Sequence, residues 1–403
     1  MLLSDDSLKD RELAGSGPGN KPDLVCLSHL RWDFVYQRPQ HLMSRFARGR
    51  RVFFVEEPIL GDHPEPRMEV SERQGGIRLA VPHMPHGLSP EQSETVQRDL
   101  LRDLLDEHEV ADFVLWYYTP MALPHAEGLE PLAVVYDCMD ELTLFRGAPR
   151  ELVDREAKLL DAADLVFTGG QSLYESKRER HPRVFPFPSS IEADHFGKAR
   201  SLREARDEPA GQAALPRPRL GYFGVIDERL DLDLLAAVAE ARPDWQIVMV
   251  GPVVKIDPAT LPRRSNLHYP GMKSYEELPA WLAGWDVALM PFALNESTRF
   301  ISPTKTPEYL AGGRPVVSTP IRDVVKPYGE RKLVEIADIS RGHEEFVAAV
   351  ERALAGYGEE WLAQVDEFLS HGSWGRTWQQ MSDLIDAAVA SRREGLRRSL
   401  SVL

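Results

Sequence analysis

This chain has few cysteines, no long apolar run and no excess of basic residues. Its 403 residues include two cysteines, Cys26 and Cys138, which are too few for a disulfide framework. No window approaches the roughly 18 consecutive apolar residues of a membrane-spanning helix. Lys and Arg total 48 against 63 Asp and Glu, and the resulting net charge of −15 disfavours binding to nucleic acid through its phosphates. We therefore expect a cytoplasmic enzyme or binding protein with no nucleic-acid partner.

Two cofactor signatures are also missing. A dinucleotide-binding fold has three spaced glycines between its first strand and the helix that follows. Here the first expected strand leads into residues 28–32 (SHLRW), and the second half of the chain offers only Gly221 and Gly224. The 12 histidines show no metal-ligand spacing. The sequence thus disfavours hydride transfer, and we expect neither a metal site nor a bound cofactor.

Short apolar runs alternate with amphipathic stretches along the whole chain. Runs rich in Val, Phe and Tyr are typical of buried parallel strands. The expected strands are residues 24–27, 52–55, 113–117, 132–136, 165–168, 219–224, 247–251, 267–271, 287–291, 315–319 and 333–337. Apolar residues at helical spacing predict helices between them, over 39–48, 151–163, 275–283, 306–311 and 344–355. This alternation predicts an α/β protein with two Rossmann-like, doubly wound domains that face a central cleft.

The composition changes near the middle of the chain. Residues 197–218 have little apolar periodicity and end in a Pro-rich stretch, which predicts a linker or, alternatively, a frayed surface helix within one domain. Residues 1–20 carry acidic residues where a signal peptide needs an apolar core, and we expect a disordered leader. The expected organisation is a first domain over 21–196 and a second domain over 219–372, followed by residues 373–403.

The most informative segment is residues 291–320, PFALNESTRFISPTKTPEYLAGGRPVVSTP. A strand is expected to end at its start, followed by a polar loop, a short helix and a Gly-Gly pair that leads into the next strand. Loop amides and a helix start favour an anion such as a phosphate, and Lys305 adds a positive charge there. Glu308, about one turn further on, can accept two hydrogen bonds from a diol such as that of a ribose.

This segment resembles the nucleotide-sugar site of GT-B glycosyltransferases. It is similar to family 4 and family 1-like enzymes, including the teichuronic-acid type that builds bacterial envelope polysaccharides. In them a Glu-bearing helix precedes the pattern A-x-G-x-P-V-V, which reads AGGRPVV over residues 311–317. The resemblance implies that Glu308 binds the donor ribose and that Thr304 and Lys305 hold the diphosphate. It also implies an acceptor-binding first domain, a nucleotide-sugar-binding second domain, and a C-terminal helix over 373–403 that crosses back to the first.

Three further positions fit the same resemblance, and one does not. Gly224 stands where the family has a glycine turn, Arg229 where it has a diphosphate-binding arginine, and Met272 after the strand whose end faces the nucleobase. The family's second glutamate, eight residues before the ribose-binding one, is Phe300 here. This departure leaves a retaining reaction, an inverting reaction and a loss of catalysis open.

The acceptor and a catalytic base are expected on the first domain. The segment after the first strand carries Arg31, Arg38 and His41 in a W…RPQ-H pattern that is similar to envelope-polysaccharide enzymes, and their side chains could contact a phosphate or sugar hydroxyls. The alternative is a purely structural loop. Asp137 and Asp140 follow the fourth expected strand, where a partly buried carboxylate has a raised pKa and can act as a base. We expect Asp140 first and Asp137 second in that role, or else a helix cap.

Together these features predict a hexosyltransferase-type enzyme that uses a nucleotide diphosphate sugar, with a UDP-sugar favoured, and a sugar, lipid-linked or polysaccharide acceptor. The expected process is synthesis of cell-envelope or extracellular polysaccharide. Two alternatives share the architecture: a nucleotide-sugar 2-epimerase, which needs no acceptor, and a non-catalytic sugar-nucleotide-binding protein. Two arginine clusters suit either solvated helix ends or peripheral contact with anionic lipid at the inner face of a membrane. They are Arg45, Arg48, Arg50, Arg51, Arg392, Arg393, Arg397 and Arg398.

Overall fold

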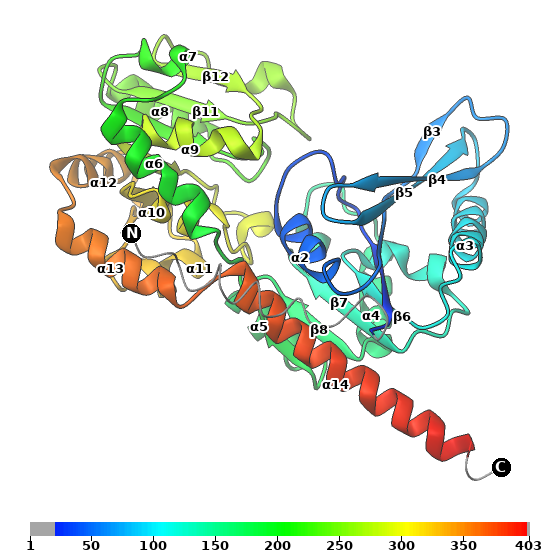
Figure 1. The fold of residues 1–403 in the computed structure, drawn as a ribbon. Coiled ribbons are helices and arrows are strands. Elements are labelled where there is room, and N and C mark those ends of the chain that lie inside the picture. The colour runs from blue at the N-terminus through cyan, green and yellow to red at the C-terminus, as the bar shows by residue number, and fades with distance from the viewer. Residues whose placement is uncertain (1–20, 401–403) are drawn as a thin grey trace.

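The structure, a computed structural model, describes residues 21–400, so the leader expected over residues 1–20 lies outside the described residues. Figure 1 shows two α/β domains, one built from the first part of the chain, coloured blue through cyan to green, and the other from the part that follows, coloured green through yellow to orange. Each domain is built on its own sheet of mainly parallel strands. The doubly wound α/β class expected from the sequence is confirmed.

The first domain contains a nine-stranded sheet in the order β3-β5-β2-β1-β6-β7-β8-β9, with β4 antiparallel to β5. Its strands are β1 (Asp23–Leu27), β2 (Val52–Val55), β3 (Ile59–Gly61), β4 (Arg67–Arg73), β5 (Ile77–Pro85), β6 (Phe113–Tyr117), β7 (Ala133–Cys138), β8 (Leu165–Thr168) and β9 (Val184–Pro186). Its helices and short turns are α2 (Arg38–Phe46), α3 (Pro90–Glu107), η2 (Pro120–Ala126), η3 (Leu142–Leu144), α4 (Glu151–Ala162) and α5 (Gln171–Lys177).

The alternating side chains of β1 show how both faces of this sheet are buried. Leu24 and Cys26 join a cluster that includes residues of α2 and of the C-terminal helix, whereas Val25 and Leu27 join a cluster with residues of α3 and α4. Successive strand residues point to opposite faces, so helices on both sides are needed to cover an apolar run of this kind.

The second domain contains a six-stranded parallel sheet in the order β12-β11-β10-β13-β14-β15. Its strands are β10 (Arg219–Phe223), β11 (Gln246–Val250), β12 (Leu267–Gly271), β13 (Val287–Met290), β14 (Val316–Ser318) and β15 (Glu335–Ile336). The helices and turns of residues 219–370 are α8 (Leu232–Ala241), η4 (Pro258–Thr260), η5 (Tyr275–Glu277), α9 (Leu278–Ala283), η6 (Glu296–Thr298), α10 (Lys305–Ala311), α11 (Arg322–Val324), η7 (Val325–Gly329), η8 (Ile339–Arg341), α12 (Glu344–Ala355) and α13 (Glu359–Ser370).

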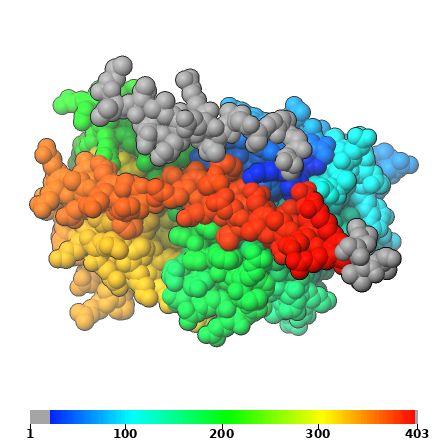
Figure 2. Space-filling view, turned by 60° about the horizontal axis from the view of Figure 1, so that its bottom comes forward, coloured from blue at the N-terminus to red at the C-terminus, as the bar shows by residue number. Residues whose placement is uncertain are grey.

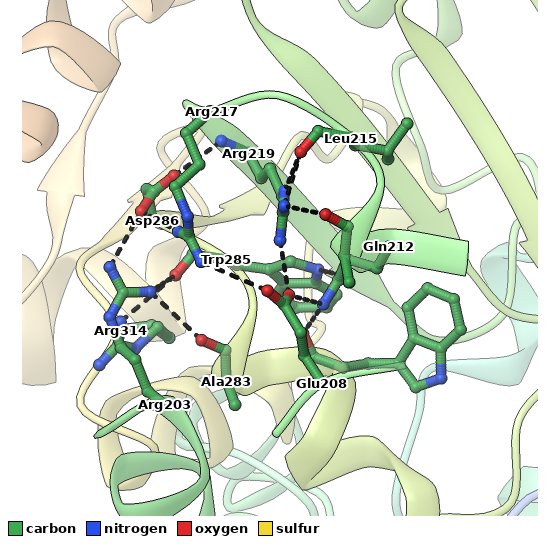
Figure 3. A network of polar contacts seen from close by, with 12 residues as sticks. Arg203, Glu208, Gln212, Leu215, Arg217, Arg219, Ala283, Trp285, Asp286 and Arg314 are labelled. Atoms are coloured by element: carbon green, nitrogen blue, oxygen red, sulfur yellow. Dashed lines mark hydrogen bonds and ion pairs between the residues drawn. The ribbon is translucent and has the colours of Figure 1, made fainter. Parts of the chain in front are cut away.

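The segment expected to be a linker, residues 197–218, is largely helical and packed. It continues α6 (Ala193–Ala205) and includes α7 (Ala210–Ala213). Figure 3 shows the polar network that fixes it to the second domain. Gln212 accepts from the buried indole of Trp285 at 2.7 Å, Arg203 pairs with Asp286 at 2.9 Å, and Glu208 pairs with Arg219. The weak apolar periodicity arises because arginines and carboxylates, rather than a hydrophobic stripe, make these contacts.

The last helix, α14 (Trp374–Leu400), returns to the first domain. It contacts α2, β7 and β8, and its residues Trp374, Met381 and Ile385 belong to a core cluster of that domain. Figure 2 shows α13 and α14, in orange to red, as one band across a face that both domains share. Within residues 21–400, no helix is both long enough and apolar enough to cross a membrane.

We predict that Gln212→Leu lowers the free energy of unfolding by about 1–3 kcal/mol, because it leaves the buried Trp285 N–H without an acceptor. Urea denaturation followed by circular dichroism measures this loss. The control is Gln364→Leu, which changes an exposed side chain of α13 and should alter stability by less than about 0.5 kcal/mol. Equal stability of the two variants would show that the segment around α7 behaves as a loose linker.

Candidate functional site

A cavity of about 930 Å³ lies between the two domains. Its walls come from the segments that follow β1 and β7 in the first domain, and β10, β11, β12 and β13 in the second. Parallel α/β sheets bind their ligands beyond the carboxyl ends of the strands, where these connecting segments diverge. The volume is typical of a small-molecule site, for which about 300–1,000 Å³ is usual. This cavity is therefore the candidate functional site.

The six residues expected to bind a donor all border this cavity, although they come from three separate segments of the second domain. They are Gly224, Arg229, Met272, Thr304, Lys305 and Glu308. The segments meet because β10, β12 and β13 end at the same edge of one sheet. Side chains that could bind an anion and a carboxyl group that could bind a diol thus border the same cavity.

Gly224 makes room for Lys305. It has a φ of 137°, and a Cβ placed there would lie 2.1 Å from Cε and 2.7 Å from Nζ of Lys305. The ammonium lies 5.5 Å from the centre of the Tyr222 ring. Burial, with the positive charge of Arg229 adding to it, lowers the pKa of Lys305. The missing side chain at position 224 is what allows this lysine to lie against the end of β10.

Glu308 presents a carboxyl group on the same helix. Burial raises the pKa of this carboxyl group, the ammonium of Lys305 opposes that rise, and the negative charge of Glu192 adds to it. The α10 helix begins at Lys305, so the two side chains lie within one turn of each other. A carboxylate that faces a cavity and lacks full solvation is well placed to accept hydrogen bonds from ligand hydroxyls.

Arg229 is held in place by a neighbouring carboxylate. Its Nε and Nη2 donate to Asp227 at 3.0 and 2.8 Å, and its guanidinium lies 5.7 Å from the Phe145 ring of the first domain. Burial alone would lower the pKa of Arg229, but the hydrogen bonds and charge of Asp227 raise it. This arginine therefore stays charged, with a fixed orientation, at the border of the cavity.

Asp140 borders the cavity from the opposite wall, directly after β7. Burial raises the pKa of its carboxyl group, while the charge of Arg229 lowers it and that of Asp227 raises it. A carboxylate with a raised pKa is a stronger proton acceptor, which suits a general base. Of the two aspartates proposed from the sequence, Asp140 is the one at the cavity.

The structure places Asp137 elsewhere and gives it another task. Its side chain is fully buried, and both carboxylate oxygens accept hydrogen bonds from Arg38 at 2.8–3.2 Å. Arg38 also donates to the Phe187 carbonyl at 2.7 Å, so each nitrogen of its guanidinium makes a hydrogen bond within the first domain, although the residue borders the cavity. This corrects two expectations: Asp137 is not at the cavity, and Arg38, which is buried, serves to pair with Asp137.

The other two acceptor candidates also turn away from the cavity. Arg31 donates to Glu56 at 2.9 Å and to the Glu57 carbonyl at 2.6 Å, which fixes the loop after β1. The His41 ring stacks on Trp374 of α14, with centroids 4.6 Å apart and planes inclined by 10°. Neither side chain is among those that border the cavity. Each side chain is used in packing or pairing within the protein.

The sequence did not indicate several first-domain residues that do border the cavity. Phe34 and Tyr36, each 40% exposed, follow β1, and Arg73 and Gln74 lie at the turn between β4 and β5. Arg73 pairs with Asp33, which joins the turn to the loop. The aromatic residues were visible in the segment WDFVYQ, but the turn could not be placed without the β4–β5 hairpin.

Phe300, at the position of the family's second glutamate, does not face the cavity. It packs against a core cluster of the first domain, and the Arg299 guanidinium lies 5.2 Å from the centre of its ring. An apolar ring therefore joins the two domains at this position.

Comparisons with known proteins agree with this geometry. Residues 217–356 match the family described as glycosyl transferases group 1. A Bacillus subtilis (strain 168) protein, TuaH, whose name assigns it to teichuronic acid biosynthesis as a glycosyltransferase, is 24% identical over 295 residues, which cover 66% of this chain and 71% of that protein. A sucrose-phosphate synthase from Thermosynechococcus elongatus matches with a TM-score of 0.69 and 14% identity, over 92% of this chain and 100% of that one.

A trehalose-6-phosphate structure from E. coli, bound with UDP-2-fluoro glucose, matches with a TM-score of 0.62 and 13% identity, over 90% of this chain and 99% of that one. The fold is therefore the GT-B fold of glycosyltransferases. Residues 217–356 match the glycosyl transferase group 1 domain, and the family and structural matches together indicate that the chain is a transferase.

We predict that Asp137→Asn lowers the free energy of unfolding by about 3–5 kcal/mol, because it leaves Arg38 buried without a counter-charge. The measurement is a urea titration. Asp366→Asn is the matched control, because it breaks an exposed pair with Arg200 and should cost no more than about 1 kcal/mol. A variant of Asp137 with native stability and no turnover would return this residue to the role of a catalytic base.

Proposed function

We propose that this protein transfers a hexose from a nucleotide diphosphate sugar, with a UDP-sugar favoured, to an acceptor hydroxyl in cell-envelope or extracellular polysaccharide synthesis. The observation that carries the proposal is the convergence of Lys305, Glu308 and Arg229 on a cavity that Asp140 borders from the other domain. The name of the B. subtilis relative supports the polysaccharide process, and the UDP-sugar in the E. coli structure supports the donor.

The second domain would hold the donor. Lys305 and Arg229 offer positive charge to the diphosphate, Thr304 offers a hydroxyl, and Glu308 accepts hydrogen bonds from the ribose diol. Met272 would border the nucleobase, and the space left by Gly224 keeps Lys305 close to the end of β10. The same cations stabilise the negative charge that develops on the diphosphate as it leaves.

The chemistry would take place between the two walls. The acceptor oxygen forms a bond to the anomeric carbon, the bond from that carbon to the diphosphate breaks, and the electron pair leaves with the diphosphate. Asp140 receives the acceptor proton. Direct displacement of this kind inverts the anomeric configuration; a retained configuration would mean that Asp140 only positions the acceptor.

The acceptor belongs to the first domain in this proposal. It is a sugar, a lipid-linked sugar or a polysaccharide, and it lies near Phe34, Tyr36 and Asp140. We place the reaction in the cytoplasm, with peripheral contact to the inner face of a membrane where the acceptor is lipid-linked. The arginines at the end of α14 would make that contact, although Arg393 already pairs with Asp112 at 2.6 Å and Arg398 with Glu394.

We expect UDP to stabilise the protein against heat more than GDP, ADP or dTDP does. The Glu308→Gln variant should bind UDP roughly ten- to hundredfold more weakly, because a charged acceptor of hydrogen bonds is lost. Calorimetric titration measures both affinities. Glu330→Gln, on an exposed side chain of the same domain, is the control and should bind UDP normally. Unchanged affinity in Glu308→Gln would remove the ribose contact from the proposal.

Asp140→Asn should lower kcat for sugar transfer by about 10²- to 10⁴-fold while leaving UDP affinity within about threefold, because a base acts on the acceptor and not on the donor. Asp154→Asn, an exposed change on α4, is the control.

Incubation with the donor alone distinguishes the two alternative functions. Conversion of the donor without acceptor indicates a 2-epimerase, and binding without turnover over a broad acceptor panel indicates a non-catalytic protein.

A further inference from the structure

Side chains from three parts of the chain meet at one end of the cavity. Tyr36 precedes α2, Arg45 lies on α2, Glu192 lies in the connection between the domains, and Tyr275 begins η5 in the second domain. Tyr36, Glu192 and Tyr275 border the cavity itself. We call these four residues the hinge cluster. Neither the donor contacts nor the proton transfer described above uses them.

The carboxylate of Glu192 joins the two domains through hydrogen bonds. Arg45 of the first domain donates to its Oε1 at 2.9 Å, and the Tyr275 hydroxyl of the second domain donates to its Oε2 at 3.2 Å. His41 Nδ1 lies 3.5 Å from Oε1. Burial alone would raise the pKa of Glu192, but the hydrogen bonds and charges of His41 and Arg45 lower it to about 2. Glu192 is therefore ionised throughout the physiological range.

Ring stacking makes a second connection in the same place. The Tyr275 ring stacks on Tyr36 with centroids 4.5 Å apart, and on His195 with centroids 4.2 Å apart and planes inclined by 6°. Tyr36 also meets His41 edge to face at 4.7 Å. The contact between Tyr36 and Tyr275 spans the cavity, so it is lost when the domains separate. Tyr275 thus takes part in both connections, through its hydroxyl and through its ring.

The hinge cluster is within electrostatic reach of the proposed donor site. The negative charge of Glu192 acts on Glu308, and that of Glu308 acts in turn on Tyr275. The charged and titratable groups that interact electrostatically with Glu308 include Lys305 and Tyr309 on its own helix, Glu192 in the connection and Tyr275 at η5. A substitution in the hinge cluster is therefore expected to alter the binding of a ligand by Glu308.

We propose that Glu192 and Tyr275 are positioning residues for the donor, which hold the two domains together over the cavity and fix the surroundings of Glu308. Neither residue needs to touch a reacting atom. This inference rests on the proposed function, because it takes Glu308 as the group that grips the donor ribose. It also assigns a task to the W…RPQ-H segment, whose Tyr36 and His41 belong to or support the cluster.

The first test removes one hydroxyl and keeps the ring. Tyr275→Phe should weaken UDP binding by about three- to tenfold and raise the KM for the donor, with less effect on kcat. Tyr269→Phe is the matched control, because it also removes a 3.2 Å hydrogen bond of a tyrosine in the second domain, to the Pro262 carbonyl and away from the cavity. Equal affinities in the two variants would overturn the proposal.

The second test follows UDP affinity against pH in the wild type and in Glu192→Gln. The affinity should fall as the pH drops through the pKa of Glu308, because a protonated carboxyl group no longer accepts two strong hydrogen bonds. Removal of the Glu192 charge lowers the pKa of Glu308, so the midpoint of this loss should move to lower pH. A purely structural role would weaken binding at every pH without moving the midpoint.

His41 also faces Glu192. Burial lowers the pKa of His41 and Glu192 raises it, so Glu192→Gln lowers the pKa of His41 further. The two proposals also fail in different ways. A wild-type protein that no nucleotide stabilises overturns the proposed function. Wild-type binding with an unmoved midpoint, and with Tyr275→Phe equal to Tyr269→Phe, overturns the role of the hinge cluster alone.

Discussion

The chemistry of the cavity depends on an amine and a carboxyl group that are half-buried within one turn of α10. A desolvated charge is costly unless an opposite charge lies near it, and Lys305 and Glu308 supply that charge to each other. Burial lowers the pKa of Lys305 and raises that of Glu308, and the charge of each group opposes the shift of the other. The arrangement also requires a glycine at position 224, because any Cβ there would meet the lysine side chain. Gly224 and the first turn of α10 thus fix where the amine and the carboxyl group of this domain can meet a ligand.

Much of the fold follows from the sequence because the strands are short, apolar and buried on both faces. Each strand expected from the sequence is present, with its ends shifted by no more than two residues. The strands that were missed, β3, β4, β5 and β9, lie toward the edges of the first sheet. β4 has polar residues on both faces, as its sequence RMEVSER shows, and its position is set by pairing with β5. A strand that is positioned by pairing in this way needs no apolar run, so its sequence pattern does not reveal it.

The two walls of the cavity differ in how much of them the sequence reveals. The donor side could be predicted because Thr304, Lys305 and Glu308 are neighbours in one segment, whose order alone places them together. On the acceptor side the sequence indicates Asp140, but it does not reveal the tasks of Arg38 and His41, because the partners that engage these residues are distant in the chain. Arg38 pairs with a carboxylate 99 residues away, and the ring of His41 stacks on Trp374 of the last helix. A polar side chain that follows a strand indicates a binding site only when it is not already paired with a residue far away in the sequence.

The contacts between the domains bear on how the cavity opens. The N–H of Ser172 donates to Asp323 at 3.1 Å, and that of Arg146 donates to Glu228 at 3.1 Å. Each bond is exchanged for one to water when the domains part, so its net contribution is small, and bonds to a charged group reach only about 1.5–3 kcal/mol. The ion pair of Arg322 with Glu175 and the stacking of Tyr36 on Tyr275 add to these bonds. A ligand that touches both walls favours the closed arrangement to the extent that its affinity for the two states differs.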